Sequence, residues 1–210
     1  LLAQEPYVEA TPRYVSFEGG YHDLGLSPHV GSLLDLLSRT PGQYADKEKP
    51  KTVLYPGMYA HQASAFQAFL RDGKDVVVAT GTGSGKTECF LVPILATLYD
   101  EAATRPASFA VPGVRALILY PMNALVNDQL ARLRLLLGDQ GVAGQFRDLG
   151  AGKRHPTFGM YTGRTPYPGP RSAARDGERV EPLLEYYTTM DEQLEKELRK
   201  LGRYPAKDLE

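Results

Sequence analysis

The eight residues from Thr80 to Thr87, TGTGSGKT, combine three glycines with small polar residues, a lysine and a final threonine. Glycine adopts backbone conformations that other residues avoid, so this stretch can turn tightly and direct successive N–H groups at an anion. The Lys86 ammonium would bind the β- and γ-phosphates of a nucleotide, and the Thr87 hydroxyl would bind Mg²⁺. The stretch therefore predicts a loop that binds a nucleoside triphosphate together with Mg²⁺.

The elements predicted on either side of this loop suit the same chemistry. The apolar run 75–79 predicts a strand, and the stretch 88–99 is compatible with a helix whose positive N-terminal end would face the bound anion. The strict form of the motif has glycine at its first position, where this chain has Thr80. A chance Gly-Lys-Thr sequence in an ordinary loop is the alternative, and the order strand, turn, helix argues against it.

A glutamine, Gln62, stands 24 residues before Lys86 in the segment YPGMYAHQ. Its carboxamide carries a donor and an acceptor side by side, which matches the N6 and N7 edge of adenine. Tyr59 beside it offers an aromatic ring for stacking on the base. The alternative is a glutamine that caps a helix or is merely exposed.

A second junction, YPMNALVNDQ at residues 120–129, follows the apolar run 115–120. Ligands bind where parallel strands end and helices begin, and the N-terminal amides of such a helix can hold a phosphate of a nucleic-acid strand. Taken alone, the junction would be an ordinary connection between a strand and a helix.

Apolar patterns along the chain predict an α/β fold with a parallel sheet and right-handed crossovers. Short strands are predicted at 75–79, 115–120 and 157–162, the last after a glycine turn at Gly150 to Gly152. Helices are predicted at 30–37, at 88–99, at 122–137 and around 191–201. Residues 51–74 are predicted to contain a further amphipathic helix, in which Ala63, Phe66, Phe69 and Leu70 recur at helical spacing and which ends with Asp72-Gly73. Residues 1–50 are expected to be a leader that wraps on the domain, 51–165 the nucleotide-binding lobe, and 166–210 an insertion or linker.

Composition is that of an ordinary soluble protein, with 42% hydrophobic residues and a formal net charge of −1 over 210 residues. The charge is uneven, because residues 131–180 carry nine Lys and Arg against four Asp and Glu. That stretch favours a local phosphate-contacting surface, with a solvated loop as the alternative. The single cysteine, Cys89, excludes an internal disulfide and is expected to be a small buried residue. The chain lacks a long apolar stretch and a signal peptide, which favours a cytoplasmic protein without a membrane partner.

Four segments together resemble the motifs of superfamily 2 helicases of the DEAD/DEAH type, in the right order between residues 52 and 165. TGTGSGKT resembles motif I, in which Ala or Thr commonly replaces the first glycine. MYAHQ resembles the glutamine motif, YPMNALVNDQ resembles motif Ia, and Tyr161 to Thr165 resembles the Thr-Gly motif that touches the nucleic-acid backbone. The resemblance implies the first RecA-like lobe of a P-loop NTPase.

The resemblance assigns a role to each motif residue. ATP and Mg²⁺ would be bound by Tyr59, Gln62, Thr80, Gly81, Thr82, Gly83, Ser84, Gly85, Lys86, Thr87 and Glu88, with Lys86 and Thr87 catalytic and Thr87 on the metal. A nucleic-acid strand would be held by Pro121, Met122, Asn123, Ala124, Gln129, Thr162, Gly163 and Arg164. The sequence of motif Ia, YPMNALVNDQ, is most similar to that of large bacterial helicases with a DUF1998-type region, including those of the anti-phage systems DISARM and Druantia. That similarity favours DNA over RNA as the substrate, a second RecA-like lobe as partner, and a further protein of the defence system.

Motif II, the Asp-Glu pair that such motors need after a hydrophobic strand, has one candidate, Asp191-Glu192. Polar residues precede that pair and an acidic helical stretch follows it, so it is interpreted as a decoy. The chain is therefore expected to be the front portion of a larger motor that cannot hydrolyse ATP alone. A nucleotide-switched adaptor without catalysis and another P-loop enzyme, such as a kinase, are the alternatives.

Overall fold

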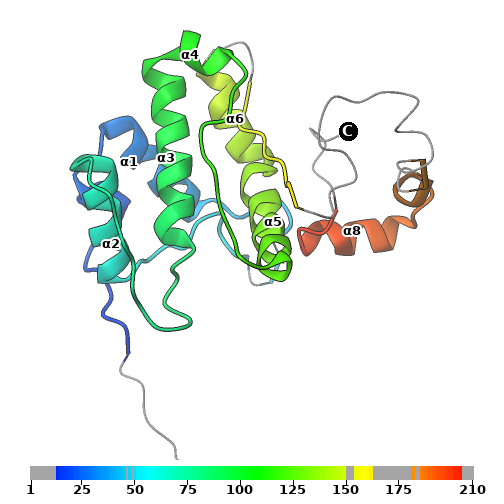
Figure 1. Cartoon of the computed structure of the whole chain (residues 1–210), viewed down its shortest axis with the longest axis horizontal. Helices are drawn as coiled ribbons and strands as arrows, with labels where there is room; N and C mark the ends of the chain where they lie inside the picture. Colours follow the sequence, from blue (N-terminus) through cyan, green and yellow to red (C-terminus); the bar gives the residue numbers. More distant parts are fainter. Residues whose placement is uncertain are drawn as a thin grey trace, which may run out of the picture. The chain divides into compact units, whose positions relative to one another are not determined.

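The computed structural model describes residues 13–45, 47, 48, 50–149, 154–162, 181, 182 and 185–204. By its contacts the chain divides into two compact units. The first consists of Leu1–Asp35 and Pro56–Thr97, and the second of Leu36–Tyr55 and Leu98–Glu210. Figure 1 shows the helices, with colours that follow the sequence.

The first unit contains the short helix η1 (Tyr21–Leu24), the first part of α1 (Pro28–Arg39), α2 (Ala60–Phe66), η2 (Gln67–Arg71) and the first part of α3 (Glu88–Thr104). Apolar residues three and four positions apart give α1 one buried stripe, which confirms the helix predicted at 30–37. Leu34 of that stripe and Phe66 of α2 are almost fully buried. The ring of Tyr21 stacks on Phe66 with the ring centroids 6.5 Å apart.

Helix α2 runs directly into η2, a turn with π-helical bonding. Ala63 and Phe66 are each 1% exposed, as expected for the buried face, whereas Phe69 is 46% exposed on the π turn. The helix stops at Asp72 because Gly73 adopts a left-handed backbone conformation with φ of 63°. The predicted end of this helix at Asp72-Gly73 is therefore confirmed.

Helix α3 is longer than predicted and continues through Pro93 to Thr104. Its side chains are apolar enough for burial on several faces, and Val92, Leu95 and Ala102 are at most 1% exposed. This burial outweighs the hydrogen bond that Pro93 cannot donate.

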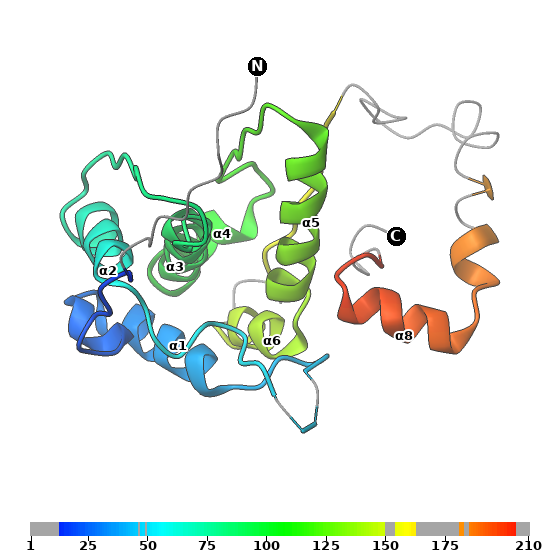
Figure 2. The same cartoon turned by 90° about the horizontal axis from the view of Figure 1, so that it is seen from below.

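The second unit contains α4 (Pro106–Ala110), α5 (Asn123–Leu137), α6 (Gln140–Asp148) and α8 (Glu192–Lys200), together with the ends of α1 and α3. The ring of Phe146 on α6 contacts Tyr99 and Phe109 at centroid distances of 5.4 and 5.7 Å. Helix α6 follows α5 after a short turn and contacts it (Figure 2). Asp139 fixes that turn, since its carboxylate accepts from Gly141 N, Val142 N and Gln43 N.

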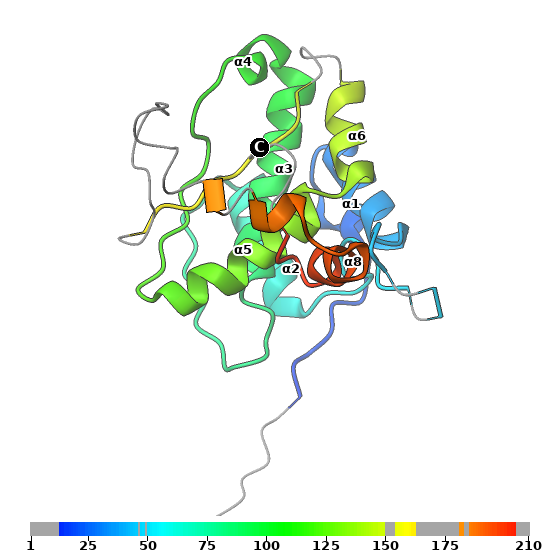
Figure 3. The same ribbon diagram turned by 90° about the vertical axis from the view of Figure 1, so that its right-hand side faces the viewer.

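Helix α5 confirms the helix predicted at 122–137, and its buried apolar residues lie at its end. Leu136 and Leu137 are 8% and 5% exposed, whereas Met122 and Leu125 near its start are 59% and 42% exposed. The turn after α8 lies against this helix, because Arg134 Nη1 donates to the carbonyl of Gly202 over 3.1 Å (Figure 3). In the described part of the chain, the start of the predicted apolar face of α5 is thus exposed.

The predicted strands are not formed among the described residues, whose only β pairing is two isolated bridges, Ser16 with Tyr59 and Pro41 with Thr52. Residues 74–80 and 112–120 are nonhelical and mostly exposed, with Val77 94% and Leu117 76% exposed. A strand exists only when a neighbour supplies hydrogen bonds, and no described segment pairs with these runs. Residues 157–162, the third predicted strand, are also nonhelical and form no β-bridge with another described segment, and Gly150 to Gly152 lie outside the described residues.

The acidic helix predicted around 191–201 is confirmed as α8. Asp191 is its N-cap, with a carboxylate that accepts from Gln193 N over 2.8 Å. Glu192 has a 90% exposed side chain that faces Lys196. Both acids of the candidate motif II therefore have roles in starting this helix. None of the helices in the described ranges is long and apolar enough to cross a membrane.

Candidate nucleotide-binding site

The predicted phosphate loop connects the extended run 75–79 to the start of α3. Gly83 and Gly85 have φ angles of 77° and 72°, in the region that favours glycine. Thr80 Oγ1 lies 2.6 Å from the hydroxyl of Ser84, which is 1% exposed. A glycine at position 80 could not make this bond, so the departure from the strict motif supplies a clasp across the base of the loop.

The backbone N–H groups of the loop and its backbone carbonyls differ in their hydrogen bonding. Within the described chain, no N–H from Gly81 to Thr87 donates to a backbone carbonyl. The carbonyls, in contrast, accept from side chains, and Lys86 Nζ donates to those of Thr80 and Gly81 over 2.8 and 2.5 Å. Unpaired N–H groups in successive residues form a concave site for an anion.

Gln62 joins α2 to this loop and is 6% exposed. Its Oε1 accepts from Tyr59 N over 2.7 Å, so the capping role considered for it is present. Its Nε2 donates to the carbonyl of Gly85 over 3.0 Å. A carboxamide has two N–H donors and two acceptor lone pairs, so one of each remains for an adenine edge. Adenine recognition by Gln62 stays a prediction.

The end of the loop leads into α3 by short turns. The carbonyl of Thr87 accepts from Phe90 N and Leu91 N, which places its half-buried side chain at the helix start. Glu88 is the first residue of α3. Burial, and then the charge of Glu88, raises the pKa of the Cys89 thiol, which keeps it neutral and unsuited to nucleophilic chemistry. The predicted Mg²⁺ ligand, Thr87, therefore sits where a nucleotide phosphate would meet the helix.

An aromatic cluster borders the loop and includes one residue that the sequence analysis missed. The rings of Tyr59 and His61 stack with centroids 5.7 Å apart, and Tyr14 contacts both rings at 5.3 and 5.7 Å. Tyr14 comes from the predicted leader, more than sixty positions before the loop, and no local motif marks it. Only the chain's return to residues 58–60 brings it here.

The residues predicted to hold nucleic acid lie in the second unit, and the structure describes most of them. Residues 121–124 are exposed at the start of α5, whose N-cap, Met122, makes no side-chain capping bond. Gln129 is 8% exposed, and its Nε2 donates to Asp128 Oδ2 over 3.2 Å. Its Oε1 has no hydrogen-bond partner among the described residues. Thr162 is half-buried, while Gly163 and Arg164 lie outside the described residues.

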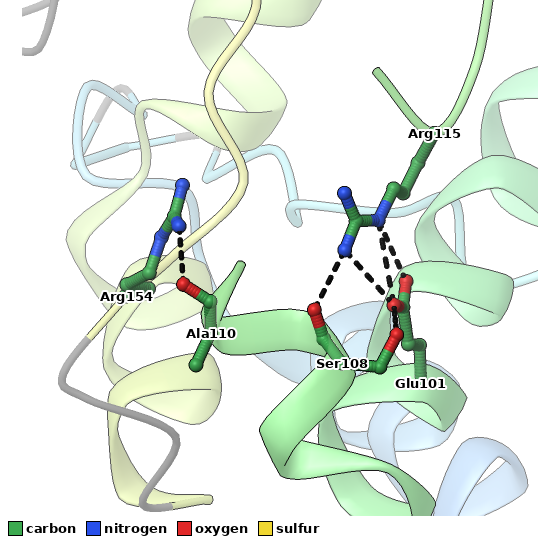
Figure 4. A network of polar contacts seen from close by, with 5 residues as sticks. All are labelled: Glu101, Ser108, Ala110, Arg115 and Arg154. Atoms are coloured by element: carbon green, nitrogen blue, oxygen red, sulfur yellow. Dashed lines mark hydrogen bonds and ion pairs between the residues drawn. The ribbon is translucent and has the colours of Figure 1, made fainter. Parts of the chain in front are cut away.

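A polar network at the start of the second extended run is a further feature that the pattern did not predict (Figure 4). Arg115 donates to the carboxylate of Glu101 on α3 over 3.1 to 3.4 Å and to the carbonyl of Ser108 on α4 over 2.7 Å. The hydroxyl of Ser108 also donates to Glu101. These bonds, to Arg115 first, hold the pKa of Glu101 below its usual value. The network anchors the beginning of the run that leads to the predicted nucleic-acid junction.

Comparison with known proteins agrees with the geometry of the loop. Residues 59–157 match the model of the DEAD/DEAH box helicase family. The Druantia protein DruE of Escherichia coli (strain UMEA 4076-1) is 45% identical over 216 aligned residues, which cover 100% of this chain and 11% of DruE. This similarity includes the leader and the segment after residue 165. No solved structure matches the chain.

Two shorter similarities lie within the same family. The uncharacterized ATP-dependent helicase YprA of Bacillus subtilis (strain 168) is 34% identical over 85 residues, 40% of this chain and 10% of YprA. The ATP-dependent RNA helicase DDX54 of Mus musculus is 50% identical over 54 residues, 26% of this chain and 5% of that protein. The chain belongs to the DEAD/DEAH box helicases and spans about a tenth of the length of the first two relatives.

Proposed function

We propose that this chain is the ATP-binding first lobe of a nucleic-acid-dependent ATPase motor. The observation that carries the proposal is the polarity of the loop: in the described part of the chain its N–H groups from Gly81 to Thr87 donate to no backbone carbonyl, while its carbonyls are held by side chains. Such a loop binds the phosphates of a nucleotide, and the N-terminal end of α3 partly compensates their negative charge.

In this site each side chain has a separate task. The Lys86 ammonium exchanges its bonds to two loop carbonyls for the β- and γ-phosphates, and the Thr87 hydroxyl binds Mg²⁺, which supplies charge compensation for the triphosphate. Gln62 uses its remaining donor and acceptor on the adenine edge. Hydrolysis needs groups beyond this set, and we assign them to a motif II outside residues 1–210 and to a second RecA-like lobe, so that this segment alone does not hydrolyse ATP.

The same proposal includes the parallel sheet of a RecA-like fold. The runs 75–79 and 115–120 are mostly apolar, nonhelical and mostly exposed, which leaves them open to pairing with further strands. Each would pair within the full-length protein, and residues 121–124 would then lie at the carboxyl edge of that sheet, where Thr162 to Arg164 join them on a nucleic-acid strand. Residues 1–50 and 166–210 flank the lobe as leader and insertion.

We further propose a role in anti-phage defence, with DNA as the substrate, in the cytoplasm, and with another protein of the same system as partner. Support comes from the 45% identity to the Druantia protein DruE along the entire chain. The name of the shorter match DDX54 specifies RNA, so RNA is the competing substrate. ATP hydrolysis by the full-length protein, measured with single-stranded DNA and RNA of one sequence, distinguishes the two.

Replacing Lys86 tests the function itself. Lys86→Ala in the full-length protein should abolish ATP binding, nucleic-acid-stimulated ATP hydrolysis and protection against phage, since the side chain points at the ligand and not into the core. Lys74→Ala is the matched control, because this lysine has a 68% exposed side chain and pairs with Asp72 at the surface. Turnover of Lys86→Ala equal to that of Lys74→Ala would exclude the motor function.

The kinase and adaptor alternatives predict other outcomes. An adaptor binds ATP through Lys86 but shows no hydrolysis with any nucleic acid. A kinase transfers phosphate to a small molecule and is indifferent to nucleic acid. Gln62→Ala adds a check on the base, because it should weaken ATP more than GTP if Gln62 contacts adenine.

A further inference from the structure

A short piece of the leader runs antiparallel to the residues that start α2. Phe17 N donates to the carbonyl of Met58 over 2.9 Å, Ala60 N donates to the carbonyl of Val15 over 2.8 Å, and Ser16 forms a β-bridge with Tyr59. These are backbone bonds, so the position of this piece does not depend on its side chains. They deliver Tyr14 to the phosphate loop.

Three side chains each hold one carbonyl of the loop. Tyr14 Oη donates to the carbonyl of Thr82 over 3.3 Å, His61 Nε2 lies 2.9 Å from that of Ser84, and Gln62 Nε2 donates to that of Gly85 over 3.0 Å. Two of them, Tyr14 and His61, contact each other through their rings. The Tyr59 ring lies against both and limits their rotation.

A held carbonyl fixes the direction of the next N–H, because the peptide unit is planar and trans and the two bonds point to opposite sides. The bond from Tyr14 to the Thr82 carbonyl therefore orients Gly83 N–H. By the same geometry, His61 orients Gly85 N–H and Gln62 orients Lys86 N–H. The donors that face the phosphates are thus set from behind by side chains that do not touch the phosphates themselves.

Tyr14 also limits which residue can stand at position 81. A Cβ on Gly81 would lie 2.7 Å from Tyr14 Oη, closer than such atoms approach. The hydroxyl therefore fills the space that the absent side chain leaves, and it packs against the loop as well as bonding to it.

We propose that Tyr14 is a positioning residue of the phosphate loop, acting with His61 to hold the loop carbonyls so that the N–H groups face the phosphates. The inference rests on the proposed ATP-binding function and extends the nucleotide site into the leader. In this proposal Tyr14 supports binding of the phosphates and makes no contact with the base.

Removing only the hydroxyl tests this assignment. In the full-length protein, Tyr14→Phe keeps the ring contacts and should weaken the affinity for ATP about threefold to tenfold, the value of one lost hydrogen bond. The affinity for inorganic tripolyphosphate should fall by the same factor, because this probe has phosphates and no base. The KM for ATP should rise by that factor while kcat stays near that of the parent protein. Val15→Ala is the matched control, since Val15 is 73% exposed and its carbonyl bond to Ala60 N survives the change.

Three other outcomes would count against the proposal. A lower affinity for ATP with an unchanged affinity for tripolyphosphate would show that Tyr14 contacts the base. Unchanged affinity for both, while Lys86→Ala loses both, would overturn the positioning role and leave ATP binding by the loop intact. Unchanged affinity in Lys86→Ala as well would exclude the function on which the inference rests. Equal thermal unfolding of Tyr14→Phe and Val15→Ala shows that the fold is preserved in the comparison.

Discussion

The phosphate loop and the junction at residues 121–124 each follow an exposed apolar run and precede a helix, yet the chain treats them differently. The loop is clasped by Thr80 and Ser84, and its carbonyls accept from Gln62, His61 and other side chains. The junction is exposed, and its N-cap, Met122, makes no side-chain capping bond. Polar side chains of the described residues thus hold the loop in place before its ligand arrives.

This difference indicates what each region needs in order to bind. The loop has its supporting residues within the leader and α2, so its donors are oriented within this segment. The junction follows a run that is anchored at its beginning by Arg115 and is otherwise exposed. We expect its geometry to depend on sheet neighbours and on the nucleic-acid strand.

The largest expected effect comes from adding one methyl group to the loop. Gly85→Ala would force a side chain onto a φ of 72° and drive its Cβ into Gln62 Nε2, which breaks the bond to the Gly85 carbonyl. We expect ATP affinity to fall about 100-fold. Gly83→Ala, with a φ of 77° and open space around its Cβ, adds backbone strain alone and should cost about tenfold. Equal losses in titrations of the two variants would show that Gln62 does not support the loop.

The helix after the junction provides a second comparison, between its buried end and its exposed start. Leu137→Ala empties a site that is 5% exposed and should lower the free energy of local opening of α5 by about 3 kcal/mol. Leu125→Ala, at 42% exposure, should change it by less than about 0.5 kcal/mol. Amide hydrogen exchange of α5 measures both. A large effect of Leu125→Ala in the full-length protein would mean that this start is covered there and is not a free surface for nucleic acid.

Amide hydrogen exchange measured in the two apolar runs tests the comparison further. If the runs pair in a sheet, amides of residues 76–79 and 116–119 in the full-length protein should exchange at least about 100-fold more slowly than those of an unpaired segment, because sheet bonds must open first. Exchange as fast as that of an unprotected loop would contradict the parallel sheet.

The smallest expected effect concerns the network that anchors the second run. The pKa of Glu101 is lowered in the folded protein by Arg115 and Ser108, so its ionised form stabilises the fold above the unfolded pKa near 4.5. That contribution, about 1 kcal/mol, should disappear as the pH falls through the lowered folded pKa. Glu101→Gln should flatten the acid dependence of opening in α3 and α4. Glu192→Gln, at a 90% exposed side chain, should leave it unchanged.

Local sequence patterns were sufficient to predict structures that depend on residues within a single segment. The apolar run 30–37 predicted α1, Asp72-Gly73 predicted the end of a helix, and the spacing of TGTGSGKT located the loop, because each rule acts within one or two turns of chain. The pattern also predicted the helix at 88–99, but it did not predict that α3 continues to Thr104, since the burial of residues such as Ala102 depends on other elements.

The sequence by itself determined the motifs, their order and the family to which the chain belongs. Only the tertiary structure decided that Gln62 holds the carbonyl of Gly85 and that Tyr14 supports the loop across more than sixty residues. The same holds for the bond between Glu101 and Arg115. The physical reason is that hydrogen bonds between distant segments follow from the path of the backbone, whereas helices and turns follow from residues that are already neighbours.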